Sequence, residues 1–125
     1  MAKIMVIDDE SSIRAVLRML IETLGHEATV ASDGRTGVEL FQSALLPDQE
    51  PFRIVITDLV MKGMKGDDVK DAIRQLRPKT KVVLCTGYSN EPMAMHPQDH
   101  GFDGALIKPF DKDYFARLIG ELLLS

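Results

Sequence analysis

Several features are scarce in this sequence, and each scarcity excludes a class of protein. Cys85 is the only cysteine among 125 residues, which excludes an intrachain disulfide and a cysteine-rich metal site. The 15 basic residues are scattered and outnumbered by 19 acidic ones, for a net charge of −4, so we expect no nucleic-acid surface. No apolar run approaches the roughly 18 residues of a membrane-spanning helix, and no signal peptide opens the sequence. We therefore expect a cytoplasmic protein without a membrane partner.

The remaining composition is ordinary for a soluble globular protein. Hydrophobic residues make up 45% and charged residues 27% of the chain, close to average usage. A length of 125 residues fits one compact domain over residues 1–125. Such a domain buries roughly two-thirds of its unfolded surface, so its core needs no disulfide or structural metal.

Apolar blocks alternate with amphipathic blocks along the whole chain. Five of them are typical of short buried strands: residues 3–7, 26–31, 52–57, 81–86 and 104–108. Helical spacing predicts helices over 12–24, about 35–45 and about 69–76, and a last helix that Asp111 caps. This alternation favours a doubly wound α/β fold, a parallel sheet covered on both faces. Pro92 and Pro97 interrupt residues 89–104, so we expect a short or broken fourth helix.

The same spacing predicts which helix faces point inward. In the first helix the predicted core face consists of Ile13, Val16, Leu17, Leu20 and Leu24. In the last helix it consists of Tyr114, Phe115, Leu118, Ile119 and Leu122. Ser11 or Ser12 can cap the first helix, and Gly25 suits its left-handed end.

Acidic residues end two of the predicted strands. Asp8 and Asp9 follow the first strand, and Asp58 follows the third. Ligands of an open parallel sheet bind beyond the carboxyl ends of its strands, and in the order 2-1-3-4-5 these two strands are neighbours. Two carboxylates about 5 Å apart repel by about 3 kcal/mol at an effective dielectric constant near 20, so we expect a cation there. Oxygen ligands favour a hard cation, Mg²⁺ or Mn²⁺.

Strand-end aspartates can also simply cap the helices that follow them. However, Thr86 and Lys108 end the fourth and fifth predicted strands, so a hydroxyl and an ammonium group would face the carboxylates. This set suits phosphoryl transfer, in which cations neutralise the phosphoryl oxygens and one carboxylate is the nucleophile. Glu10, the third acid of the run, is interpreted as a first-turn residue favourable to the helix dipole.

The whole chain resembles the receiver domain of two-component response regulators. The resemblance lies in the order and spacing of "VIDDE" (6–10), "VITDLVMKGMKG" (55–66), "LCTG" (84–87) and "GALIKPF" (104–110). It implies a flavodoxin-like (βα)5 three-layer sandwich. It also implies a phosphoacceptor that a histidine kinase or histidine phosphotransfer protein phosphorylates. Such a domain catalyses only its own phosphotransfer and autodephosphorylation, so we do not expect an enzyme with a separate substrate.

The resemblance assigns roles to individual residues. Asp58 would be the phosphoacceptor, and it would bind the metal directly together with Asp9 and the main-chain carbonyl of Val60. Asp8 would act mainly through a metal-bound water. Thr86 would hydrogen-bond the phosphoryl group, and Lys108 would pair with it.

Two backbone features are implied as well. Gly66 would close the loop after the phosphoacceptor. The bond between Lys108 and Pro109 would be cis, although only about 5–6% of X-Pro bonds in folded proteins are.

Four positions near the predicted site are expected to give this chain properties that differ from those of many receivers. Lys62 stands where proline is usual, and Ala105 stands where many receivers carry an aromatic ring that couples phosphorylation to a binding surface. We therefore expect little signalling through an aromatic switch. Val60 and Tyr88 would flank the phosphoryl group. Because neither side chain can activate water as a carboxylate or amide can, we expect slow autodephosphorylation.

Other functions remain alternatives. A flavodoxin-like electron carrier shares the fold, but "DDESS" (8–12) puts negative charge where a flavin phosphate would lie. A Mg²⁺-dependent phosphatase with an aspartate nucleophile would need a second aspartate at the position of Val60. A degenerate receiver could serve only as an interaction module. The chain could be a monomeric or weakly dimeric stand-alone receiver, or a fragment of a larger protein such as a hybrid sensor kinase.

Overall fold

A five-stranded parallel sheet forms the centre of the molecule. The computed structural model describes residues 1–87, 90 and 92–125. The strands are β1 (Lys3–Ile7), β2 (Glu27–Ala31), β3 (Ile54–Asp58), β4 (Lys81–Thr86) and β5 (Gly104–Ile107). Their order is β2-β1-β3-β4-β5 and all pairs are parallel, which confirms the predicted fold and strand order.

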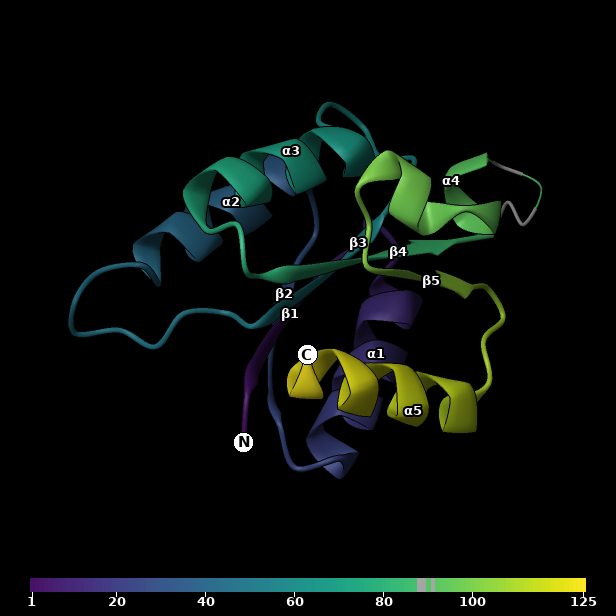
Figure 1. The fold of residues 1–125 in the computed structure, drawn as a ribbon, viewed down its shortest axis with the longest axis horizontal. Coiled ribbons are helices and arrows are strands. Elements are labelled where there is room, and N and C mark those ends of the chain that lie inside the picture. The colour runs from purple at the N-terminus through teal and green to yellow at the C-terminus, as the bar shows by residue number, and fades with distance from the viewer. Residues whose placement is uncertain (88–89, 91) are drawn as a thin grey trace.

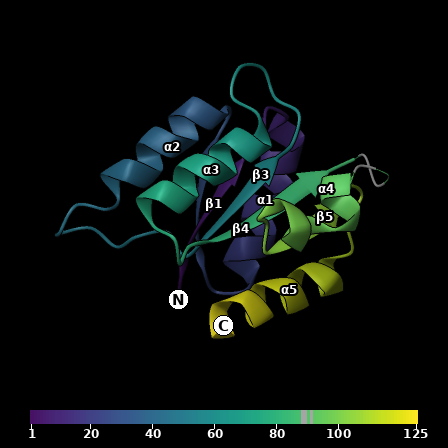
Figure 2. The same ribbon diagram turned by 45° about the horizontal axis from the view of Figure 1, so that its top comes forward.

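Helices cover both faces of this sheet. They are α1 (Ser11–Thr23), α2 (Gly34–Ser43), α3 (Gly66–Leu76), α4 (Pro92–Met95) and α5 (Lys112–Leu124), with a 3₁₀ helix η1 (Pro97–His100) after α4. Figures 1 and 2 show α2 and α3 on one face and α1 and α5 on the other. Within the described ranges no helix is long and apolar enough to cross a membrane.

Strand β1 shows why its sequence is a continuous apolar run. Met5 and Ile7 pack into the core beneath α2 and α3, whereas Ile4 and Val6 pack into the core beneath α1 and α5. Successive side chains of a strand point to opposite faces. A strand covered on both faces therefore needs apolar residues at every position.

The predicted interruption of the fourth helix is confirmed. Helix α4 has only four residues, and η1 begins at Pro97. Two basic side chains of α3 hold this segment in place. Lys70 Nζ donates to the carbonyl of His100 at 2.7 Å, and Arg74 Nη2 donates to the carbonyl of Gly101 at 2.9 Å. Contacts with α3 thus replace the internal hydrogen bonds that a longer helix would supply.

The predicted inward faces were partly wrong. Val16 and Leu24 of the first helix are 41% and 38% exposed, while Ile21, which was not predicted, is fully buried with Leu17. Tyr114 of α5 is likewise 41% exposed. Successive residues of a helix point about 100° apart around its axis. The spacing of apolar residues therefore predicts the buried face only to within about one residue.

The start of α1 also differs from its prediction. Glu10, rather than Ser11 or Ser12, is the N-cap residue, and its side chain makes no capping hydrogen bond. The predicted left-handed stop at Gly25 is confirmed by its φ of 87°. The other predicted boundaries differ by two residues or fewer at most ends.

Candidate functional site

The register of the sheet brings Asp8 and Asp58 together. Ile7 of β1 pairs with Thr57 of β3, so the next residue of each strand emerges at the same carboxyl edge. Both side chains are nearly buried, with residue exposures of 1% for Asp8 and 7% for Asp58. Asp9, by contrast, is exposed. The predicted convergence of carboxylates therefore involves two buried acids and one that faces solvent.

Lys108 provides the positive charge between them. Its Nζ lies 3.0 Å from Asp8 Oδ2 and 3.6 Å from Asp58 Oδ1, and its side chain is only 15% exposed. The main chain of Lys108 is tied to β4, because its N–H donates to the carbonyl of Thr86 at 2.8 Å. The Lys108–Pro109 bond is cis, as the family resemblance implied.

Main-chain amides orient the two buried carboxylates. The N–H of Glu10 donates to Asp8 Oδ1 and the N–H of Leu59 donates to Asp58 Oδ1, both at 2.9 Å. Asp8 Oδ2 is buried, and among the described residues its close partner is the ammonium group of Lys108, 3.0 Å away.

The site perturbs the protonation of its own groups. Burial, followed by the charge of Asp8, raises the pKa of Asp58 to about 6, although Lys108 and the Leu59 amide act in the opposite direction. Burial by itself lowers the pKa of Lys108, but its ion pair with Asp8 and the charge of Asp58 more than reverse this, so its pKa is raised. The pair is thus a charged lysine beside a carboxylate that ionises less readily than usual.

The donor set around this point fits a hard divalent cation. Carboxylate oxygens of Asp8, Asp9 and Glu10 lie within 4.8 Å of one another. A cavity of about 390 Å³ opens beside them, lined by Asp9, Glu10, Asp58, Val60, Gly87 and Lys108. Carboxylates with room for water are the ligands that Mg²⁺ prefers, and a carboxylate oxygen such as Asp8 Oδ2, which contacts Lys108, has a further lone pair for such a water.

Glu10 has a different place from the one that its sequence position suggested. It precedes the first turn of α1 as the N-cap, and its Oε1 lies 3.6 Å from Lys108 Nζ. The interpretation of Glu10 as only a first-turn residue is therefore wrong. Its adjacency to Asp8 and Asp9 was the signal that could have placed it at the site.

The other predicted site residues lie around the same edge. Thr86 ends β4 and is fully buried, and Val60, at 54% exposed, lines the cavity. Gly66 packs so closely on the loop after β3 that a Cβ there would overlap the carbonyl oxygen of Asp58. Tyr88 lies outside the described residues.

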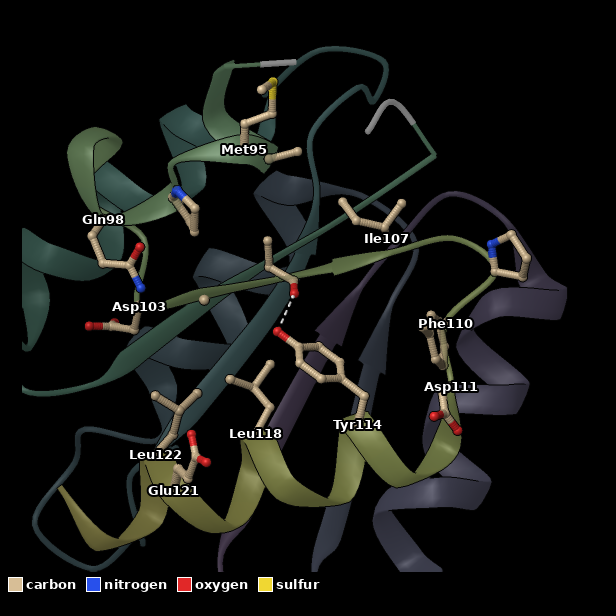
Figure 3. Close-up of a pocket in the computed structure, with 15 residues that line it drawn as sticks. Met95, Gln98, Asp103, Ile107, Phe110, Asp111, Tyr114, Leu118, Glu121 and Leu122 are labelled. Carbon is tan, nitrogen blue, oxygen red and sulfur yellow. Dashed lines mark hydrogen bonds between the residues drawn. The ribbon is translucent and has the colours of Figure 1, made fainter. Parts of the chain in front are cut away.

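A second cavity, of about 610 Å³, lies between α4, β5 and α5. Figure 3 shows Tyr114 of α5 leaning across this space, and its hydroxyl donates to the carbonyl of Ala105 at 3.3 Å. Because Ala105 has no ring, the aromatic group that covers this part of β5 comes from the helix. Met95 and Ile107 line the same cavity from the opposite side (Figure 3).

Comparisons with known proteins agree with this geometry. A family model described as "Response regulator receiver domain" matches residues 4–119. The chain is 32% identical to the regulatory protein AtoC of Escherichia coli over 97% of its own length, but spans only 25% of AtoC. A crystal structure of a response regulator receiver domain protein from Clostridium thermocellum is 30% identical, with a TM-score of 0.86 over 98% of this chain and 94% of that one.

A further similar structure was solved with a metal ion bound. The response regulator protein TrrA of Thermotoga maritima, in complex with Mg²⁺-BeF, is 28% identical to this chain. Its TM-score is 0.83, and the match covers 98% of this chain and 99% of TrrA.

Proposed function

Because this chain belongs to the response regulator receiver domain family, we propose that Asp58 accepts a phosphoryl group in a Mg²⁺-dependent reaction. A histidine kinase or a histidine phosphotransfer protein is the donor. The observation that carries this proposal is the position of Lys108, whose ammonium group contacts Asp8 and lies 3.6 Å from Asp58. A buried cation shared by two strand-end carboxylates, beside an open cavity, is suited to a transferring phosphoryl group.

The metal would be held by residues from two strands. Asp9 and Asp58 would bind Mg²⁺ directly, with the main-chain carbonyl of Val60, and Asp8 would bind one of its waters. Asp9, Asp58 and Val60 all line the cavity, and the buried Asp8 carboxylate contacts Lys108 beside it. Bound Mg²⁺ supplies positive charge to the phosphoryl oxygens.

The transfer itself requires little chemistry from the protein. One oxygen of the Asp58 carboxylate attacks the phosphorus atom, the P–N bond of the donor phosphohistidine breaks, and its electron pair stays on the imidazole nitrogen. A pKa of about 6 leaves Asp58 about nine-tenths ionised at pH 7, so the nucleophilic form dominates. Lys108 would pair with the phosphoryl oxygens, and Thr86 would donate a hydrogen bond to them after moving from its buried position.

A direct test uses a small phosphodonor. Wild-type protein incubated with acetyl phosphate and Mg²⁺ should gain the mass of one phosphoryl group, and EDTA should prevent the gain. Asp58→Asn should remove it, whereas Asp48→Asn, at an exposed loop position, should retain it. Failure of the wild type to react under these conditions would favour the interaction-module alternative.

We propose a cytoplasmic receiver, monomeric or weakly dimeric, that acts through protein partners rather than through nucleic acid or membrane. Its reactions would be its own phosphotransfer and autodephosphorylation. The stand-alone receiver and the receiver of a hybrid sensor kinase are both consistent with the proposed chemistry.

A further inference from the structure

The side chain of Arg14, near the start of α1, folds back onto the loop that carries the acids. Its Nη1 donates a hydrogen bond of 2.7 Å to the main-chain carbonyl of Asp8. That carbonyl belongs to the peptide group that joins Asp8 to Asp9. The main-chain N–H of Arg14 donates to the carbonyl of the N-cap residue Glu10 at 3.2 Å, which is the first hydrogen bond of α1 itself, so the guanidinium bond is the contact specific to this side chain.

General helix preferences do not explain this arrangement. The first turn of a helix favours anionic side chains, because its N-terminus carries partial positive charge. Arg14 is a cation at the fourth residue of α1, and the acidic side chain at this end of the helix is that of the N-cap residue Glu10 rather than one in the first turn. Among the described residues Arg14 forms no ion pair within 4.0 Å, and its guanidinium makes only the one hydrogen bond to Asp8. A residue that does not follow the local preference of its helix position, and for which no compensating gain in stability is evident, is often found at a functional site.

Asp9 is the residue that most needs such support. Asp8 and Asp58 have their carboxylates fixed by main-chain amides and Lys108. Asp9 is exposed, and no hydrogen bond or ion pair among the described residues fixes its side chain. The peptide group that precedes it is the one whose carbonyl accepts the hydrogen bond from Arg14. Groups that orient a metal ligand without touching the metal commonly change metal affinity by one or two orders of magnitude.

We propose that Arg14 is a positioning residue for the metal site: by holding the Asp8–Asp9 peptide group, it aims the Asp9 carboxylate into the acidic cavity. This inference rests on the proposed function, because it concerns the same Mg²⁺ site. It assigns to α1 a role in metal binding that none of the acidic residues or Lys108 performs.

The direction in which Mg²⁺ affinity changes when Arg14 is replaced distinguishes a positioning role from a purely electrostatic one. A guanidinium near an acidic site repels a divalent cation, so removing its charge alone would tighten Mg²⁺ binding. Loss of positioning would instead weaken binding. The two explanations for any effect of Arg14 thus predict changes in opposite directions.

The experiment measures Mg²⁺ affinity by titration calorimetry on the full chain. Arg14→Gln should weaken binding roughly tenfold. Arg14→Lys keeps the charge but loses the planar fork, and should lie between the wild type and Arg14→Gln. Arg18→Gln is the matched control, because Arg18 lies one turn further along α1 in an exposed ion pair with Glu22. It should bind Mg²⁺ within roughly twofold of the wild type.

Each outcome supports or overturns the inference. Unchanged or tighter binding by Arg14→Gln would overturn it and leave the proposed function standing, as would an equal loss in Arg18→Gln. A wild type that does not bind Mg²⁺ would overturn both. Circular dichroism in EDTA would show whether Arg14→Gln folds. If it does not, Arg14→Lys decides alone, because affinity equal to that of the wild type would contradict positioning.

Discussion

Lys108 Nζ lies 3.6 Å from Asp58 Oδ1, although β4, α4 and η1 all intervene between the two residues along the chain. The contact exists because β3 and β5 flank β4 and end at the same edge of the sheet. It limits the rise in the pKa of the proposed nucleophile, since the charge of Lys108 opposes the burial and the charge of Asp8 that raise the pKa of Asp58.

Lys108→Met should therefore raise the pKa of Asp58 further above about 6 in the metal-free protein. The reason is the loss of the Lys108 charge, which favours the ionised carboxylate. A carboxyl-carbon NMR titration would measure it. Lys112→Met, at an exposed position of α5, is the control, and a similar rise in that variant would contradict the assigned role of Lys108.

Asp58→Asn should stabilise the metal-free protein at neutral pH. Because the pKa of Asp58 rises from 3.8 to about 6 on folding, ionising this group opposes folding by about 2–3 kcal/mol. The penalty is complete above about pH 6, shrinks as the pH falls towards 3.8, and is absent below that. Urea denaturation in EDTA at about pH 7.5 and about pH 4 should show a larger free energy of unfolding for Asp58→Asn than for the wild type only at the higher pH. No gain at the higher pH would contradict the raised pKa.

The link between Arg74 and Asp103 should stabilise the region before β5. Arg74 Nη2 lies 2.6 Å from Asp103 Oδ2, which also accepts the N–H of Val82 at 2.8 Å. Arg74→Met should lower the free energy of unfolding by about 2 kcal/mol, because it leaves a partly buried carboxylate without its charged donor and also removes the hydrogen bonds of Arg74 to the carbonyls of Thr80 and Gly101. Arg35→Met removes an exposed pair with Glu39 and should cost less than about 0.5 kcal/mol. If urea titrations showed equal decreases in the free energy of unfolding for the two variants, the Arg74–Asp103 link would not stabilise the fold more than an exposed ion pair does.

Phosphorylation should reorder β5 and α5 only slightly. Ala105 has no ring to turn, and Tyr114 already covers its carbonyl from α5 (Figure 3). Structures of the free protein and of its complex with Mg²⁺ and beryllium fluoride would test this. A large rearrangement of these two elements would contradict the expected absence of an aromatic switch.

The phosphorylated protein should lose its phosphoryl group slowly. Val60, 54% exposed at the cavity, offers no group that could activate water. Val60→Glu should shorten the lifetime, whereas Val16→Glu, at an exposed valine of α1, should leave it unchanged. Phosphate release from the purified phosphoprotein measures both. A wild-type half-life of only seconds, on the scale of fast receivers, would contradict this prediction.

The order of the elements and the edge of the sheet that carries the acids were both predictable from the amino-acid pattern. Strands buried on both faces must be apolar at every position, as Ile4, Met5, Val6 and Ile7 are, so they are visible without any partner. A residue that follows a strand must emerge at its carboxyl end. Asp8, Asp58 and Lys108 were therefore predictable as neighbours once the strand order was known.

How side chains from different elements meet depends instead on the packing of the folded chain. The contact of Glu10 with Lys108, the hydrogen bond of Arg14 to Asp8 and the position of Tyr114 over Ala105 all depend on the rotation of a helix relative to the sheet. Periodicity along the chain fixes a helix face only to about one residue, or about 100°. Packing of α1 and α5 against the sheet selects the final rotation, because only one choice buries Ile21 and Phe115 in place of Val16 and Tyr114.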